Sequence, residues 1–191
     1  MSEQESRGRV ELICGPMFAG KTTLLVERLT AAGAAGVTVV AIKPARDTRY
    51  EARRIVTHDG GALDARPIAT AAELVPAVAG AVVVGVDEAH FFDASLAKEC
   101  QSLAQHGVRV IAAGVDLDHR GQLFEVMATL QRMADEVTRL ESVCARCGAP
   151  ATLTQRLVAS EARIVVGGAG DYEPRCAQCF QGDARREDDS L

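Results

Sequence analysis

The chain has 191 residues, a mass of 20.2 kDa and a formal net charge of -5. This length fits one full-sized domain, or one domain with a small appendage, but not two large domains. The acidic balance argues against a nucleic-acid-binding protein, because no general positive field is available to hold a phosphate backbone. Five Phe, two Tyr and no Trp mean that the core must be built mainly from aliphatic side chains.

No run of about 18 apolar residues occurs, so the sequence predicts no membrane span. The polar N-terminal sequence MSEQESRGR lacks the apolar stretch of a signal peptide. We therefore expect a cytoplasmic protein. Its six cysteines would then meet a reducing compartment and serve as metal ligands or buried thiols.

Apolar runs alternate with helix-favouring stretches along the first two thirds of the chain. This alternation predicts an α/β fold with a parallel sheet flanked by helices. The motif G-P-M-F-A-G-K-T at 15–22, between the first expected strand and the first expected helix, makes this fold the P-loop NTPase type. The polar segment 43–61 is expected to form either a lid-like loop or an edge hairpin. The expected strands are 10–14, 37–42, 82–86 and 108–115, and the expected helices are 23–35, 70–79, 94–106 and 123–133.

The composition changes near residue 136, where cysteine pairs and short β-type runs replace the alternation. We predict a nucleotide-binding α/β domain over 9–135 and a small C-terminal zinc-binding domain over 136–181. Residues 1–8 are expected to be a disordered tail, and 182–191 a charged, solvated tail.

The segment Gly15–Thr22, G-P-M-F-A-G-K-T, satisfies the pattern G-x-x-x-x-G-K-[ST] between an expected strand and an expected helix. Backbone N–H groups of such a loop surround the phosphates of ATP, Lys21 reaches the β/γ-phosphates, and the Thr22 hydroxyl can ligate Mg²⁺. The expected ATP-binding residues of this loop are Gly15, Pro16, Met17, Phe18, Ala19, Gly20, Lys21 and Thr22.

A second motif, V-V-V-G-V-D-E at 82–88, ends a buried strand with two carboxylates. Asp87 is placed to orient Mg²⁺, and Glu88 to act as a general base. The alternative is that Glu88 only caps the next helix. We add Asp87, Glu88, Ala89 and His90 to the expected ATP-binding residues.

Cys144-x-x-Cys147 and Cys176-x-x-Cys179 form the spacing of a four-thiolate zinc site. Such a zinc ion would be structural, because protein ligands fill all four positions. The alternative is two independent buried cysteine pairs. Cys14 and Cys100 are expected to be small core residues.

Most aromatic residues neighbour one of these motifs, which favours a flat ligand such as a nucleobase over ordinary packing around loops. They are Phe18, Phe91, Phe92, Phe124, Tyr172 and Phe180. The polar residues Asp116, Asp118, His119 and Arg120 follow the strand expected at 108–115, where they line either the ligand edge of the sheet or a solvated loop.

Taken together, these motifs resemble the type II thymidine kinases, a zinc-containing family, over about residues 9–181. Besides the phosphate loop, the resemblance rests on K-P-x-x-D-x-R-Y (43–50), D-E-A-x-F-F (87–92), D-x-D-x-R-G (116–121), T-x-R-L (154–157) and G-G-A-x-x-Y (167–172).

The resemblance implies transfer of the γ-phosphate of ATP to the 5′-hydroxyl of thymidine, in a homotetramer inhibited by dTTP. It implies that Glu88 is the general base, that Lys21 contacts phosphate, and that Thr22 and Asp87 hold Mg²⁺. It also implies a lasso loop, about Thr154 to Tyr172, which the zinc site anchors over the nucleoside. The substrate-binding residues it implies are Met17, Phe91, His119, Phe124, Thr154, Arg163, Ile164, Val165, Val166, Gly167 and Tyr172.

The chain departs from the family pattern in the expected base pocket. His90 stands where the family has Gln, His119 where it has an aromatic residue, and Leu123 where it has Pro. We hypothesise that His119 makes base discrimination looser or pH-dependent. A kinase of another deoxynucleoside and a non-catalytic, ATP-gated zinc-ribbon protein remain as alternatives. The string D-E-A-H at 87–90 does not indicate a helicase, because 191 residues cannot supply a second motor domain.

Overall fold

The computed structural model describes residues 8–47, 53–57, 60–160 and 162–182. The large sheet consists of β1 (Val10–Gly15), β2 (Val39–Pro44), β3 (Arg54–Val56), β4 (Ala62–Ile68), β5 (Val83–Val86), β6 (Arg109–Val115) and β7 (Glu136–Arg139). The helices are α1 (Lys21–Ala34), η2 (Ala71–Glu73), α2 (Leu74–Ala77), η3 (Ala89–Phe91), α3 (Ser95–Gln105) and α4 (Glu125–Met133), of which η2 and η3 are 3₁₀ helices. A small C-terminal module carries β8 (Ser142–Val143), β9 (Pro150–Ala151), β10 (Leu153–Arg156) and β11 (Tyr172–Arg175).

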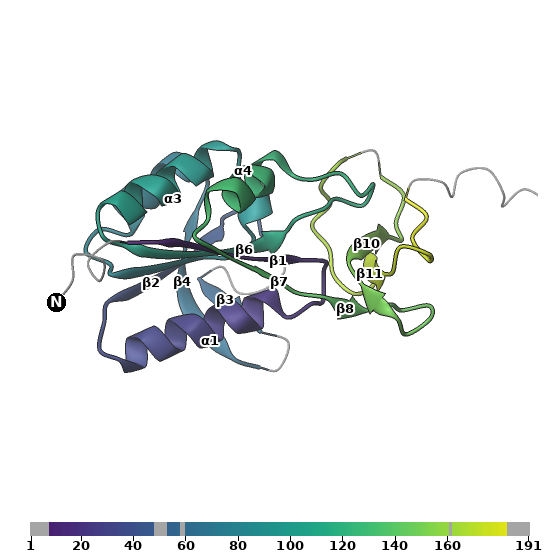
Figure 1. The fold of residues 1–191 in the computed structure, drawn as a ribbon, viewed down its shortest axis with the longest axis horizontal. Coiled ribbons are helices and arrows are strands. Elements are labelled where there is room, and N and C mark those ends of the chain that lie inside the picture. Colours follow the sequence, from purple (N-terminus) through teal and green to yellow (C-terminus); the bar gives the residue numbers. More distant parts are fainter. Residues whose placement is uncertain (1–7, 48–52, 58–59, 161, 183–191) are drawn as a thin grey trace, which may run out of the picture.

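The strands of the large sheet follow the order β3-β4-β2-β5-β6-β1-β7, and all neighbours are parallel except β3 and β4. Figure 1 shows α1 on one face of this sheet and α3 and α4 on the other. Apolar side chains fill both interfaces, with Leu25 and Leu29 of α1 on one side and Leu96 and Met127 on the other. The predicted parallel sheet flanked by helices is therefore confirmed.

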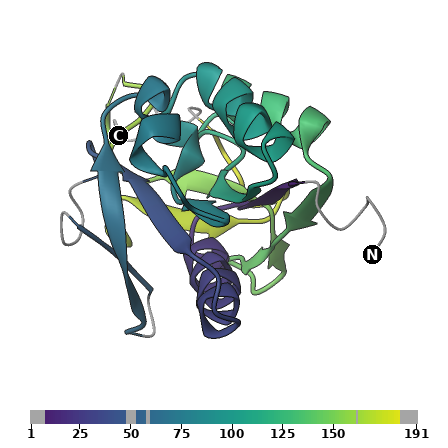
Figure 2. The ribbon, with the colours of Figure 1, turned by 90° about the vertical axis from the view of Figure 1, so that its left-hand side faces the viewer.

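The polar segment after β2 contains the expected edge hairpin, in which β3 pairs antiparallel with β4. Figure 2 shows this hairpin extending beside α1. The sequence analysis missed β4 because Arg66 and Pro67 interrupt any apolar run there. The helix expected over 70–79 is shortened to η2 and α2. At its start, the Thr70 N–H donates to Glu73 Oε1 at 3.1 Å, which is part of a capping box.

The large sheet continues past residue 135, where the sequence analysis placed a boundary. β7 pairs with β1 from Glu11↔Glu136 to Cys14↔Arg139, so residues 136–139 belong to the sheet rather than to the C-terminal module. This edge strand is mostly exposed, and its single Val137 gives no apolar run to detect.

Several sequence-based expectations fall outside the described residues. They include most of both predicted tails and the stretch 48–50 of the K-P-x-x-D-x-R-Y motif. Among the helices of the described ranges, none has the length and apolar character needed to cross a membrane.

A buried carboxylate joins three arginines near the amino ends of the central strands. The Glu11 side chain is 1% exposed and lies 2.6 Å from Arg109 Nε, 2.7 Å from Arg9 Nε and 2.8 Å from Arg28 Nη1. Burial opposes ionisation of Glu11, but the hydrogen bond and charge of Arg109, with the charges of Arg9 and Arg28, hold its pKa below the ordinary value. Glu11 thus ties β1 to β6 and α1.

We expect Glu11→Gln to lower the free energy of unfolding by roughly 2–4 kcal/mol at pH 7, because the arginines lose their buried counter-charge. Since the folded-state pKa of Glu11 is depressed, its contribution is present above the unfolded-state pKa and is lost as the pH falls through the folded-state value. Urea unfolding of both proteins from pH 7 down to pH 3 measures this. Glu27→Gln, an exposed change on α1, is the control. A deficit that does not shrink with falling pH would contradict the prediction.

Candidate active site

The loop between β1 and α1 depends on unusual backbone conformations. Gly15, Phe18 and Gly20 have φ values of 140°, 63° and 81°. A Cβ on Gly15 would lie 2.2 Å from the carbonyl oxygen of Leu140, so only glycine fits where the loop passes the end of β7. Phe18 is held in the left-handed region without being glycine, which indicates a loop constrained by its surroundings.

Lys21 and Thr22, at the end of this loop, face the carboxyl end of β5. Lys21 is 8% exposed and donates from Nζ to the carbonyl oxygen of Pro16. Burial lowers the pKa of Lys21, while the nearby charges of Glu88, Asp87 and Asp116 act in the opposite direction. Thr22 Oγ1 lies 3.2 Å from Asp87 Oδ1 and 3.4 Å from Asp87 Oδ2. The hydroxyl and the carboxylate predicted for Mg²⁺ are therefore in contact.

Glu88 does not only cap a helix, because its side chain lines the same cavity as Lys21. It adopts a left-handed backbone conformation, with φ 51°, at the turn from β5 into η3. His90 Nδ1 lies 3.4 Å from Glu88 Oε2 and 3.3 Å from the N–H of Val115. Since the Val115 N–H can only donate, Nδ1 accepts in that contact and cannot donate to Glu88 Oε2 at the same time.

Two hydroxyl groups from the C-terminal module hold the phosphate loop. The Met17 N–H donates to Thr154 Oγ1 at 3.0 Å, and Ser142 Oγ donates to the carbonyl oxygen of Phe18 at 3.2 Å. Thr154 lies on β10 and is 3% exposed, so its contact is shielded from water. The strained part of the loop is thus supported by residues more than 120 positions away in the sequence.

The segment after β6 forms a second wall of the site rather than a solvated loop. Asp116, Asp118 and His119 are 2%, 3% and 4% exposed, whereas Arg120 is exposed. An isolated bridge between Leu117 and Leu123 closes the turn. Asp116 pairs with Arg139 at the end of β7. The burial of Asp116, Asp118 and His119 favours a ligand edge over a solvated loop.

The lasso loop closes the cavity from a third side. Tyr172 OH donates to the carbonyl oxygen of Val165 at 2.8 Å, and the Gly168 N–H donates to Asp171 Oδ2 at 2.9 Å. Ile164 packs against the main apolar core. The loop therefore has a defined shape and contacts the α/β body.

The phosphate loop, the turn after β5 that carries Glu88, the segment after β6 and the lasso loop line one cavity of about 360 Å³. It is lined by Met17, Phe18, Gly20, Lys21, Thr22, Thr23, Glu88, His90, Phe91, Val115, Leu117, Asp118, His119, Phe124, Thr154, Arg163, Ile164, Val165, Gly167, Gly168, Ala169 and Tyr172. The cavity unites a phosphate-binding end with an aromatic and apolar end.

The structure brings most of the predicted site residues to this cavity and leaves a few beside it. Those outside the lining are Gly15, Pro16, Ala19, Asp87, Ala89 and Val166. Val166 is 36% exposed, whereas its neighbours Val165 and Gly167 line the cavity.

The sequence does not predict five of the lining residues, Thr23, Val115, Leu117, Gly168 and Ala169, and it places Asp118 only at a possible ligand edge. Val115 and Leu117 could have been found from their position at the carboxyl end of an expected strand. No local pattern in the sequence indicates that Asp118 is buried.

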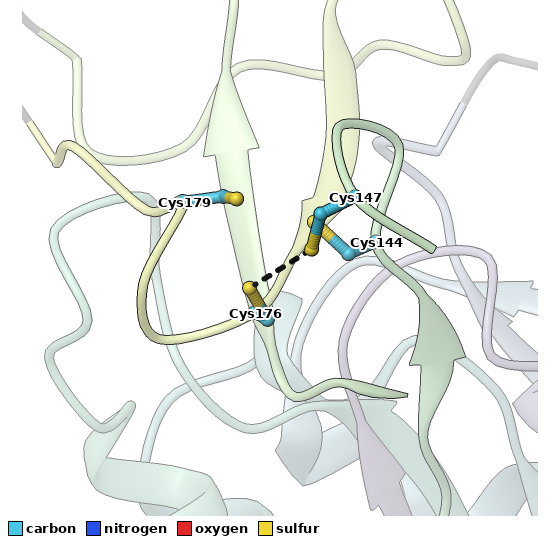
Figure 3. A group of neighbouring side chains, drawn as sticks. All are labelled: Cys144, Cys147, Cys176 and Cys179. Atoms are coloured by element: carbon cyan, nitrogen blue, oxygen red, sulfur yellow. Dashed lines mark hydrogen bonds between the residues drawn. The ribbon is translucent and has the colours of Figure 1, made fainter. Parts of the chain in front are cut away.

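The four cysteines of the C-terminal module converge, as Figure 3 shows. Their sulfur atoms all lie within 4.8 Å of one another, and Cys147 and Cys176 are 3.6 Å apart. A zinc–sulfur distance of about 2.3 Å gives sulfur–sulfur edges of about 3.8 Å in a tetrahedron. Although burial opposes ionisation, backbone N–H groups of Cys176, Arg146 and Cys147 lower the pKa of Cys144. These residues could therefore hold a metal ion, rather than forming two separate pairs.

The two other cysteines are core residues, as predicted. Cys14 and Cys100 are both 0% exposed, and burial raises the pKa of Cys100 to about 12. Neither has the thiolate character of a metal ligand or nucleophile.

Comparison with known proteins points in the same direction as the geometry. Residues 8–180 match the family model described as thymidine kinase. A thymidine kinase from Rhodothermus sp. is 46% identical over 176 residues, covering 92% of this chain and 83% of its own. Thymidine kinases from Bacteroides fragilis and Bacteroides thetaiotaomicron are 41% and 40% identical, covering 95% and 98% of this chain and 91% and 94% of their own.

Proposed function

The chain belongs to the thymidine kinase family, and from that premise we propose that it transfers the γ-phosphate of ATP to the 5′-hydroxyl of thymidine. The observation that carries this proposal is the single cavity in which Lys21 and Glu88 lie between the phosphate loop and the lasso loop. A phosphoryl donor and a flat nucleoside can occupy its two ends together. The arrangement suits direct, in-line transfer without a covalent intermediate.

In this proposal each end of the cavity has its own task. Loop N–H groups and Lys21 bind the phosphates of ATP and stabilise the charge that develops on the transferred group. Glu88 accepts the proton of the 5′-hydroxyl. Thr22 and Asp87, already in contact, would hold Mg²⁺, which supplies charge neutralisation and orientation of the phosphates. The lasso loop excludes water from the phosphoryl group.

The finer family properties are proposals as well. The cysteine cluster would hold a structural Zn²⁺ that fixes both ends of the lasso loop, since β10 and β11 pair between the two cysteine pairs. We also propose a cytoplasmic homotetramer with dTTP as feedback inhibitor, as the family resemblance implies.

The test of the function is ATP-dependent phosphorylation of thymidine, deoxyuridine, deoxycytidine and deoxyguanosine by the metal-loaded protein. Transfer to thymidine above the others would support the proposal. Transfer mainly to another nucleoside would indicate a kinase of different base selectivity. ATP binding without any transfer would favour the ATP-gated binding protein.

We expect Glu88→Gln to lower kcat by about 10²–10⁴-fold while leaving the Kd values of ATP and thymidine within about twofold, because the amide keeps the shape but cannot accept the proton. Single-turnover kinetics and calorimetric titration with each substrate measure the two effects. Glu27→Gln should retain normal turnover. A Glu88→Gln protein with near-normal kcat would contradict the assigned base.

We expect purified protein to contain about one zinc ion per chain, and its removal to lower the temperature of unfolding, because a structural metal stabilises only the folded chain. Metal analysis by mass spectrometry and thermal unfolding with and without a chelator measure this, and adding zinc back should restore the midpoint. Cys144→Ser/Cys147→Ser protein should not retain the metal. An unchanged midpoint after metal removal would contradict a structural role.

We expect the preference for thymidine over deoxyuridine to change by about threefold or more between pH 6 and pH 8, since histidine changes charge in this range and His119 lines the cavity. His119→Phe should remove that dependence. Ratios of kcat/KM for the two nucleosides at each pH measure it. The same pH dependence in both proteins would assign the effect to another group.

A further inference from the structure

Two walls of the cavity come from segments that are distant from each other in the sequence. One follows β6 and includes Asp118 and Phe124, and the other is the part of the lasso loop at 162–172. Arg163 of the lasso loop is 45 residues from Asp118, and its side chain crosses between the two walls. The cavity can stay closed only while these segments remain together.

Asp118 is held in place independently of the lasso loop. Its Oδ1 accepts from the N–H groups of Arg120 and Gln122, each at 2.9 Å. Its Oδ2 accepts from Arg163 Nε at 2.7 Å, and the Asp118 side chain is only 1% exposed. Burial opposes ionisation of Asp118, but the hydrogen bonds from Gln122, Arg163 and Arg120 together lower its pKa. Asp118 is therefore a preformed, charged acceptor.

Arg163 makes two further contacts with the same wall. Its Nη2 donates to the carbonyl oxygen of Leu123 at 3.1 Å, and its Cζ lies 4.8 Å from the centre of the Phe124 ring. Phe124 lines the cavity and is 7% exposed. The next residue, Ile164, packs against the main core. The guanidinium group thus joins the lasso loop to a side chain of the expected base pocket.

Other contacts of the lasso loop shape it from within. Arg156 donates to the carbonyl oxygens of Ser160 and Ala162, and Tyr172 donates to that of Val165. These contacts could persist in a loop that swings away from the sheet. The contacts of Arg163, like the packing of Ile164 against the main core, must break when it does.

We propose that Arg163 is a positioning residue that holds the lasso loop closed over the nucleoside, with Asp118 as its fixed acceptor. This proposal rests on the proposed function for the identity of the nucleoside. The Arg163 side chain is 46% exposed, so water and salt compete for the contact and the closure is reversible. Arg163 makes the contacts that hold the loop closed and does not touch the reacting atoms. It therefore governs entry and retention of the nucleoside.

The first test measures amide hydrogen exchange of residues 162–172 in protein without nucleoside. Arg163→Gln should exchange faster than wild type in this segment, because the closed state loses its ion pair. Arg163→Lys keeps the charge but not the planar group and should be intermediate. Arg132→Gln removes an exposed arginine of α4 and is the matched control. Equal exchange in Arg163→Gln and wild type would overturn the proposal.

The second test separates nucleoside binding from ATP binding. Arg163→Gln should raise the Kd of thymidine by about five- to tenfold and leave the Kd of ATP within about twofold. Asp118→Asn should produce a similar rise, and the double variant should be no weaker than the stronger single variant. Additive losses, or equal losses for ATP and thymidine, would overturn the proposal.

The two tests keep this proposal distinct from the proposed function. If wild-type protein phosphorylates no nucleoside, the proposed function fails, while the exchange measurement still decides whether Arg163 holds the loop closed.

Discussion

The rest of the site depends on the hydrogen bonds that residues outside the phosphate loop make with the backbone of that loop. The loop needs a left-handed Phe18, and that conformation is costly for a residue with a side chain. Thr154 and Ser142 bind the backbone on either side of the peptide that joins Met17 to Phe18. The C-terminal module therefore helps to hold the backbone of this loop in place.

Two polar side chains of the site have partners within the chain. Lys21 contacts the carbonyl oxygen of Pro16, and Thr22 contacts Asp87. Phosphate and metal would replace these partners rather than enter an unpaired site. Lys21 is 8% exposed, so the free-energy cost of removing it from water is part of folding. Ligand binding would then exchange one set of hydrogen bonds for another.

The sequence predicts the elements whose signals are local. Apolar residues make up β5, β6 after Arg109 and β1 apart from Glu11, and the phosphate loop and cysteine pairs carry fixed spacings. β4 and β7 gave no such run, since their residues face solvent along much of their length. For Asp118 the sequence leaves both a ligand edge and a solvated loop open, because its burial depends on the turn to Gln122 and on Arg163, which is far along the chain.

Charge is balanced differently at the two ends of the central strands. At the amino ends, Glu11 is enclosed by Arg9, Arg28 and Arg109, a closed network that stabilises the sheet. At the carboxyl ends, Asp116 is paired with Arg139 and Asp118 with Arg163. The carboxylates of Asp87 and Glu88 lie close enough to Lys21 for their charges to act on it. A triphosphate entering there would be repelled by these carboxylates, and the proposed Mg²⁺ at Thr22 and Asp87 is the group that would offset this repulsion.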